Sequence, residues 1–235
     1  IPPSALSGLI AASLLTAAPA SAQIPDLVWE PAEAVDQPVA DVSSGAGASI
    51  QFAGGQWHIV YAKGGDIYHR ARAATGWLDP ERLTNEPAPS SNPHIAVSAG
   101  IAGDVLHVVW EDERSGIPEV WARRLVSGTW SPETCLTCDL VPSRAPVVAA
   151  SFGAALVAWE EAGASRSIQA ARFEDGGWQP REPVSASPAE ALAPTASGGG
   201  GGYAVAWVDT RGGPGGIYIR KGLPFGGWSA ELPVP

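Results

Sequence analysis

The chain has 235 residues, enough for one large domain or two small ones, and a formal net charge of −10 at pH 7. Its 28 glycines and 22 prolines, with no methionine, are typical of many turns between short apolar runs, which excludes a helical bundle. The 14 basic residues are scattered and outnumbered by 24 acidic ones, which excludes a nucleic-acid partner, and the composition also excludes a polytopic membrane protein.

Residues 1–22 are predicted to form a secretory signal peptide. An apolar run from Leu9 to Ala18 is followed by Ala20-Ser21-Ala22, a small-x-small cleavage site before Gln23. The run is shorter than the roughly 20 residues that a membrane span needs. We therefore expect the rest of the chain to be secreted, periplasmic or held at the cell envelope, and not to span the membrane after cleavage.

Two series of aromatic residues show that the remainder is a repeat. The members of one series are 48, 53, 48 and 50 residues apart, and those of the other are 49, 49 and 48 apart. Together the two series contain eight of the ten tryptophans. The first series is Trp29, Trp77, Trp130, Trp178 and Trp228, and the second is Tyr61, Trp110, Trp159 and Trp207.

Each repeat unit is predicted to contain four short strands. The first is a brief apolar run, usually after a proline, and the second alternates with period two, as in Leu106, Val108 and Trp110. A Gly-rich hairpin leads into the third strand, and a Gly-Trp segment forms the fourth. We expect an all-β chain, a β-propeller of four-stranded blades over residues 23–235, with complete units at 48–84, 92–137, 145–185 and 193–235. A β-sandwich is the alternative, but it does not require matched tryptophan spacings.

Residues 27–36 contain a fifth copy of the fourth strand, which is typical of a strand that closes a propeller by completing the blade of the opposite terminus. We expect a truncated larger propeller on this ground. A self-contained four-bladed ring, with residues 27–36 as an extra edge strand, is the alternative.

The two cysteines, Cys135 and Cys138, form a Cys-x-x-Cys segment. A thioredoxin-like redox pair would need a strand before it and a helix after it, whereas strand-like sequence lies on both sides here. A zinc site would need a second pair of ligands. We expect a small disulfide that constrains one loop, and neither a metal nor a cofactor.

Two recurring motifs resemble those of the sialidase-like (BNR or Asp-box) propellers of exported bacterial proteins. They are the Gly-Trp turn before the fourth strand and the Trp-x-Asp-x-Arg-x-Gly hairpin before an Ile-Tyr-x-Arg strand. The resemblance covers residues 27–235, and the best copy of the Asp-box turn is Glu174-Asp175-Gly176-Gly177-Trp178. It implies a propeller fold and, for a member with an intact site, exo-sialidase-like glycoside hydrolysis.

The hairpin motif supplies the candidate binding residues Asp112, Arg114, Asp209 and Arg211. On one interpretation they bind a carbohydrate or a cation at one rim. On the other, each Asp accepts backbone N–H groups in its own turn and each Arg pairs with a neighbouring carboxylate. Repetition in two units favours the structural interpretation, because a turn is needed in every blade and a ligand-binding group is not.

No catalytic residue is predicted. The resemblance implies that sialidase chemistry would need three arginines around a carboxylate, a tyrosine nucleophile with a glutamate partner, and an aspartic acid. All four tyrosines lie at repeat positions, and so do the third-strand arginines Arg70, Arg123, Arg172 and Arg220. We expect a non-catalytic binding or scaffold module whose ligand is a glycan or an envelope protein. A glycoside hydrolase that is degenerate, or whose catalytic residues lie in missing blades, is the alternative.

Overall fold

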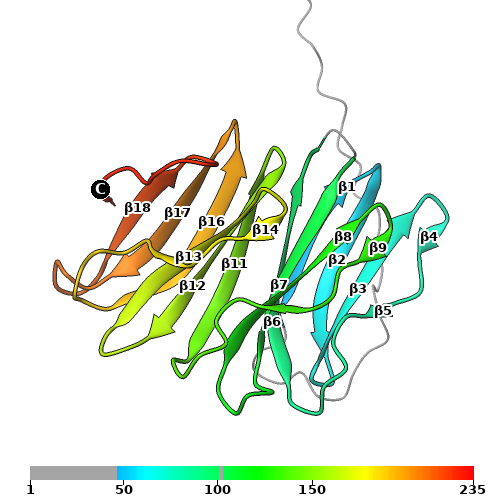
Figure 1. Ribbon diagram of the computed structural model, residues 1–235, viewed down its shortest axis with the longest axis horizontal. Helices are drawn as coiled ribbons and strands as arrows, with labels where there is room; N and C mark the ends of the chain where they lie inside the picture. The colour runs from blue at the N-terminus through cyan, green and yellow to red at the C-terminus, as the bar shows by residue number, and fades with distance from the viewer. Residues whose placement is uncertain (1–46, 101–102) are drawn as a thin grey trace, which may run out of the picture. The chain divides into compact units, whose positions relative to one another are not determined.

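The computed structural model describes residues 47–100 and 103–235, which form four antiparallel β-sheets and no helix (Figure 1). The predicted all-β fold of four-stranded blades is confirmed. Within the described part of the chain, no helix is long and apolar enough to cross a membrane. The predicted signal peptide, the closing-type strand at 27–36 and Trp29 lie outside the described residues.

Each sheet is an up-and-down meander in which consecutive strands pair. In the first three sheets the fourth strand consists of two short pieces, and both pieces pair with the third strand. The first sheet contains β1 (Ala48–Ala53), β2 (Gln56–Lys63), β3 (Asp66–Ala73), β4 (Gly76–Trp77) and β5 (Glu81–Arg82). The second contains β6 (Ser90–Ser98), β7 (Val105–Asp112), β8 (Glu119–Val126), β9 (Thr129–Trp130) and β10 (Thr134–Cys135). The third contains β11 (Ser143–Ser151), β12 (Ala154–Ala162), β13 (Arg166–Glu174), β14 (Gly177–Trp178) and β15 (Glu182–Pro183). The fourth contains β16 (Ala191–Gly199), β17 (Gly202–Asp209), β18 (Gly216–Gly222) and β19 (Leu232–Val234).

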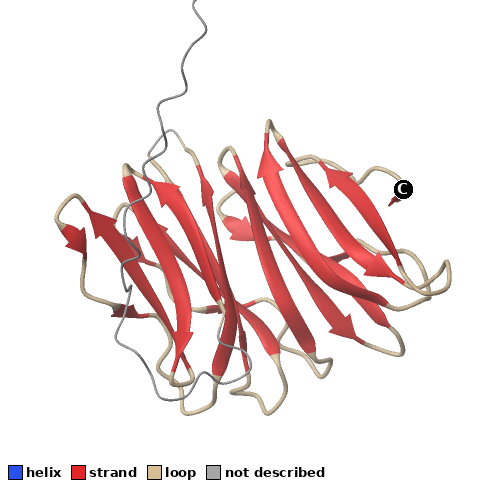
Figure 2. Ribbon diagram, turned by 180° about the vertical axis from the view of Figure 1, so that it is seen from behind, coloured by secondary structure: helices blue, strands red, loops and turns tan. Residues whose placement is uncertain are grey.

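The four sheets lie face to face in chain order, as both ribbon views show (Figures 1 and 2). The first strands of neighbouring sheets pack against one another, β1 against β6, β6 against β11, and β11 against β16. Among the described residues, the first and fourth sheets are therefore the two ends of a row. We call the packed region between two neighbouring sheets a joint.

Each joint is built around one tryptophan that inserts into the preceding sheet. Trp110 of the second sheet is 0% exposed and packs with Val60, Ile67 and Leu83 of the first. Trp159 and Trp207 occupy the same place in the next two joints. Removing about 200 Å² of such a side chain from water stabilises the fold by roughly 5 kcal/mol.

The tryptophans of the other series are half-buried and support the same joints. Trp130, Trp178 and Trp228 each pack against the core formed with the preceding sheet. Trp130 also donates a hydrogen bond from Nε1 to Glu81 of the first sheet, at 2.7 Å. Both series therefore stabilise the contact between sheets as well as the sheet to which each residue belongs.

A β-bulge interrupts the first strand of the second, third and fourth sheets at the residue before a proline. These residues, Asn92, Ala145 and Ala193, have φ angles of 49°, 49° and 50°. Such angles are strained for alanine. In two joints a carboxylate of the preceding sheet accepts the backbone N–H of the strained residue, Glu111 that of Ala145 at 2.7 Å and Glu160 that of Ala193 at 2.6 Å.

Three of the third-strand arginines occupy equivalent places, and the fourth does not. Arg70, Arg123 and Arg220 pair with Ile59, Val108 and Val205, which are equivalent positions of their second strands. Arg172 pairs instead with Leu156, one residue out of this register, and its side chain therefore lies on the opposite face of the sheet. The expectation that all four share one register was wrong for Arg172. Its Nη1 donates to the Leu223 carbonyl of the following sheet, at 3.2 Å.

Replacing Trp159 by alanine is expected to destabilise the fold by about 3–5 kcal/mol, because the side chain is 0% exposed and its removal leaves a cavity in a joint. Trp57→Ala is the matched control, because Trp57 is 46% exposed and should cost less than about 1 kcal/mol. Urea denaturation followed by tryptophan fluorescence measures both. Equal losses in the two variants would contradict the assignment of Trp159 to the joint.

Candidate functional site

The candidate binding residue Asp112 is fully buried at the end of β7. Its carboxylate accepts hydrogen bonds from Trp110 Nε1 at 3.2 Å and Ser90 Oγ at 3.0 Å. It also accepts three from Arg114, at 3.0 Å from the backbone N–H, 2.8 Å from Nε and 2.7 Å from Nη2. Arg114 in turn donates from Nη1 to Glu133 at 2.6 Å, and its guanidinium stacks over the Trp121 ring at 3.9 Å.

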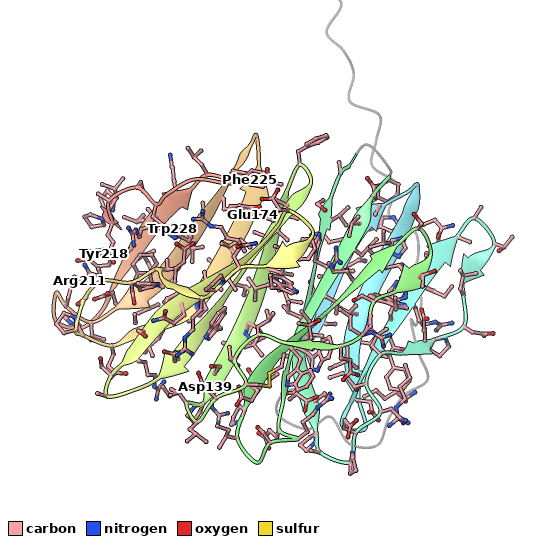
Figure 3. All side chains as sticks on the ribbon, viewed as in Figure 1. Asp139, Glu174, Arg211, Tyr218, Phe225 and Trp228 are labelled. Atoms are coloured by element: carbon pink, nitrogen blue, oxygen red, sulfur yellow. A yellow bond between two sulfur atoms is a disulfide. The ribbon has the colours of Figure 1, made fainter. Side chains whose placement is uncertain are left out.

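The fourth sheet repeats this arrangement. Asp209, also 0% exposed, accepts hydrogen bonds from Trp207 Nε1 at 3.2 Å and from the Arg211 backbone N–H at 2.9 Å. Arg211 adds bonds from Nε and Nη2 and pairs with Glu231. Its guanidinium lies 4.1 Å from the centre of the Tyr218 ring, and Figure 3 shows the two side chains together at one end of the molecule.

The third sheet has a different version of the same contact. Glu161 stands where the other two sheets have aspartate, and it pairs with Arg181 at 2.6 Å instead of with an arginine of its own hairpin. Arg181 also pairs with Asp139 of the second sheet, at 2.6 Å. Glu161 and Ile168 are seven positions apart, whereas Asp112 and Val120 are eight positions apart, so the hairpin of the third sheet is one residue shorter.

The hydrogen bonds and the burial leave the carboxylates of Asp112 and Asp209 no capacity for a ligand. Burial raises the pKa of Asp112, but the bonds from Arg114, Trp110 and Ser90 outweigh it and hold the pKa below its ordinary value. Bonds from the Arg211 side chain likewise lower the pKa of Asp209. Both carboxylates are charged, saturated and inaccessible, so we assign the two pairs to the stability of the hairpins.

The cysteines and a neighbouring carboxylate form the one cluster of metal-ligand atoms in the described part of the chain. Cys135 and Cys138 are joined in a disulfide, as the sequence analysis expected, and sulfurs bonded to each other are not thiolate ligands. Glu119 lies beside them, is 1% exposed and accepts a hydrogen bond from Thr137 at 2.6 Å. This cluster is therefore a stabilised loop and not a metal site.

A cavity of about 460 Å³ opens in the joint between the first and second sheets, at the opposite end of β7 from Asp112. Its walls combine uncharged polar groups, one carboxylate and apolar side chains that include two leucines. The lining residues are Ala53, Gly54, Gln56, His58, His69, Ala71, Gly103, Asp104, Leu106, Leu125, Ser127 and Gly128. Concave, partly apolar sites of this size with a few convergent polar groups are typical of ligand sites. We call it the His58 cavity.

Two buried histidines form one wall of the His58 cavity. His58 Nδ1 and His69 Nε2 share a hydrogen bond of 3.0 Å, and His69 Nδ1 lies 3.5 Å from Glu81. Burial is the main cause that lowers the pKa of His69 to about 4, and the nearby His58 lowers it further. Glu81 raises the pKa, but not enough to offset these two effects. Burial also lowers the pKa of His58, opposed by a backbone hydrogen bond at Ala53. Both imidazoles are therefore neutral at pH 7.

The remaining histidines and the buried tyrosine serve the fold. His107 bonds to Ser98 at 2.9 Å, and His94 accepts the Val148 backbone N–H across a joint at 3.3 Å. Tyr203 is 3% exposed, and burial raises its pKa to about 12. A phenol with a raised pKa is a poor nucleophile, so Tyr203 does not meet the requirement of sialidase chemistry.

Sequence reasoning did not identify the His58 cavity. Its lining comes from several strands and turns of two sheets, and no motif connects them. The available signal was a histidine pair on neighbouring strands, because His58 of β2 and His69 of β3 lie on paired strands, only two positions out of direct register.

No protein-family model and no curated protein sequence matches the chain. Solved structures do match. An α-L-arabinofuranosidase, Arb93a from Fusarium graminearum, superposes with a TM-score of 0.58 at 11% identity, over 80% of this chain and 66% of that one. A protein of unknown function from Dyadobacter fermentans gives a TM-score of 0.53 at 15% identity, over 80% and 64%.

A subtype N10 neuraminidase-like protein of A/little yellow-shouldered bat/Guatemala/060/2010 gives a TM-score of 0.51 at 8% identity, over 77% of this chain and 57% of that one. The chain thus spans between 57% and 66% of the length of these three proteins. At such identities the likeness shows the fold alone, and it supports a sialidase-like β-propeller.

Asp209→Asn is expected to reduce the free energy of unfolding by about 1–3 kcal/mol, because the amide cannot accept all the bonds that Arg211 and Trp207 donate to a buried carboxylate. Asp175→Asn, at an exposed turn between β13 and β14, is the control and should stay within about 0.5 kcal/mol. Chemical denaturation measures both. An Asp209→Asn variant with the same free energy of unfolding as the parent chain would contradict the assignment of Asp209 to the stability of its hairpin.

Stability is expected to fall as the pH is lowered from 6.5 toward 4. The unfolded chain takes up protons at histidines near pH 6.5, whereas burial keeps His69 neutral down to about pH 4, so the folded chain binds fewer protons in this range. His69 alone contributes on the order of 3 kcal/mol of this loss. Melting curves at pH 7 and 4.5 should show a smaller decrease for His69→Gln than for the parent chain. A parent stability independent of pH in this window would contradict the neutral buried pair.

Proposed function

We propose that this chain is a non-catalytic, exported propeller module that binds a neutral sugar residue in the His58 cavity. The cavity is the observation that carries the proposal. Its amide, hydroxyl, imidazole and carboxylate groups can exchange hydrogen bonds with the hydroxyls of a sugar, and Leu106 and Leu125 supply an apolar wall for the C–H face.

The charge of the His58 cavity favours a neutral sugar over a sialic acid. None of its described lining residues is lysine or arginine, and both histidines are neutral at pH 7. Asp104, the one carboxylate in the lining, would repel the carboxylate of a sialoside. A sialic acid bound there would have no positive partner on the walls.

The state of the hairpin carboxylates supports binding without catalysis. Asp112 and Asp209 are each 0% exposed, so neither can reach a glycosidic bond. Most glycoside hydrolases use two accessible carboxyl groups that flank that bond, and these two aspartates are not available for that role. The fold shared with an arabinofuranosidase and a neuraminidase-like protein is consistent with descent from a carbohydrate-active propeller.

Two features support export. Residues 1–22 have the sequence of a signal peptide, and the Cys135–Cys138 disulfide suits an oxidising compartment. We therefore propose that the module acts outside the cytoplasm, as a secreted, periplasmic or envelope protein. We also propose that its repeats are of the Asp-box type, on the basis of the Glu174–Trp178 turn.

A glycan array that carries neutral and sialylated sugars tests the proposal, followed by calorimetry on the best neutral ligand. Gln56→Ala should weaken its binding about tenfold, because Gln56 lines the cavity and one hydrogen bond is worth about 1.4 kcal/mol. Gln179→Ala, in the third sheet and outside the cavity, is the matched control. Preference for sialylated glycans, or equal binding by the two variants, would overturn the assignment. Turnover of a fluorogenic sialoside or arabinofuranoside would overturn the non-catalytic role.

A further inference from the structure

A second cavity, of about 310 Å³, lies in the joint between the second and third sheets. Its walls come from β8 and the β9–β10 region of the second sheet, and from β13, β14 and the turn between them in the third. Arg124 of β8 lines this cavity, and none of its described lining residues is acidic. We call it the Arg124 pocket.

The guanidinium of Arg124 has a ring beside it but no acceptor. The side chain is half-buried, and its guanidinium lies 3.8 Å from the centre of the Phe173 ring. Among the described residues, no carboxylate or carbonyl accepts a hydrogen bond from it; the backbone N–H of Arg124 donates to Ser131 Oγ at 3.0 Å. Burial lowers the pKa of Arg124, as it does for a cation without a counter-ion. Burial, and after it the charge of Arg124, also lowers the pKa of its cross-strand partner His107 to about 3.

The equivalent arginine of the third sheet, Arg172, does have acceptors. Arg124 and Arg172 each pair with the residue three positions before the joint tryptophan of their sheet, so both side chains face the following sheet. Arg172 Nε lies 2.9 Å from the Glu182 carboxylate, and its Nη1 donates to the Leu223 carbonyl of the following sheet at 3.2 Å. An arginine at this position of the fold can therefore be held by a carboxylate and a turn carbonyl together.

The carboxylate partner is missing beside Arg124 because of one sequence difference. Glu182 and Thr134 occupy equivalent positions, since each pairs with the residue two positions before the arginine of its sheet. Thr134 also lines the Arg124 pocket. The pocket thus lies where the third sheet places a carboxylate.

The carbonyl partner is missing because of a second difference. Gly222 and Phe173 are equivalent, since each pairs with the Gly-Trp tryptophan of its sheet. A Cβ atom on Gly222 would lie 3.4 Å from Arg172 Nη2, so the glycine lets that arginine reach the turn beyond it. Phe173 instead places its ring over the guanidinium of Arg124. The ring holds the cation at the pocket without satisfying its N–H groups.

We propose that the Arg124 pocket binds the carboxylate group of a small organic acid. A guanidinium and a carboxylate form two parallel hydrogen bonds, and the bound group replaces the partner that Glu182 provides in the third sheet. Pro132 and Trp178 supply apolar walls for the carbon skeleton of the acid. The net charge of −10 disfavours a polyanion, so the ligand is small. The proposal does not rest on the sugar site, because the two cavities lie in different joints.

Nuclear magnetic resonance of the ¹⁵N-labelled chain tests the proposal, with sodium acetate and sodium glucuronate as probes at constant ionic strength. Each carboxylate should shift the Arg124 Nε–H signal and the Gly176 and Gly177 amide signals in a saturable way, because these groups line the pocket. The methyl ester of glucuronate, which has no charge, should leave them unchanged. Tighter binding of glucuronate assigns the ligand to the sugar acids, and equal or tighter binding of acetate assigns it to short acids.

Two variants and a control identify the groups responsible. Arg124→Gln should weaken binding at least tenfold, read from the two glycine amides, because charge-assisted hydrogen bonds are lost. Arg144→Gln is the matched control with the same change of charge, since Arg144 is exposed and does not line the pocket. Thr134→Glu should abolish binding with Arg124 intact, because it supplies the carboxylate that Glu182 supplies in the third sheet.

The dispersion of the amide spectrum verifies that each variant is folded, and Thr134→Glu changes an exposed position that leaves the core intact. Absence of a saturable shift in the parent chain overturns the proposal. Equal binding by the parent chain and either Arg124→Gln or Thr134→Glu overturns it too. Sulfate bound as tightly as both carboxylates would overturn the assignment to carboxylates.

Discussion

The insertion of one large aromatic side chain into the neighbouring sheet is the interaction on which the rest of the structure depends. A sheet of four short strands cannot bury both of its faces alone, and each of these sheets has two apolar faces. Trp110, Trp159 and Trp207 bury these faces by inserting from their own sheet into the sheet before it, and the direction of insertion is the same in all three joints. Cores therefore form between sheets, and the stability of each sheet depends on its neighbours.

The charged groups are arranged around these cores and not around a reactive centre. Each buried aspartate of the Trp-x-Asp-x-Arg motif links three parts of one sheet: the indole on its own strand, the turn that follows, and the arginine stacked on the third strand. A buried carboxylate is unfavourable unless it is fully hydrogen-bonded, and here it is. The same residues that make the motif conspicuous in the sequence are thus the ones least able to bind a ligand.

The fold could be predicted from the sequence because its signals are local and repeated. The two aromatic series need no knowledge of pairing, and their spacings are sufficient to indicate four similar units. The register of single residues could not be predicted in the same way. Arg172 follows an alanine pair in a segment that looks like the others, yet it pairs one residue away and faces the following sheet. A shift of one residue along a strand reverses the side on which the side chain lies.

The His58 cavity could not be predicted, because it exists only once two sheets are packed together. Its lining combines the ends of β2 and β3 with the turns around β7 and β8, and these segments share no motif and no spacing. The carboxylates that accept the backbone N–H groups at the bulges could be predicted only weakly from the sequence. A Trp-Glu pair occurs at Trp110-Glu111 and Trp159-Glu160, and in each case the first strand of the next unit contains a proline directly after its bulge.

The one-way insertion of the tryptophans has a consequence for how such a chain can change in length. Each unit offers its aromatic side to the unit before it and its aliphatic side to the unit after it. An in-frame tandem duplication of any one unit would therefore create a new sheet that already fits both of its neighbours, without a compensating mutation at either border. Loss of a unit would likewise bring together two faces that match. Gene duplication and deletion can alter the number of sheets in this architecture while the contact between sheets stays the same.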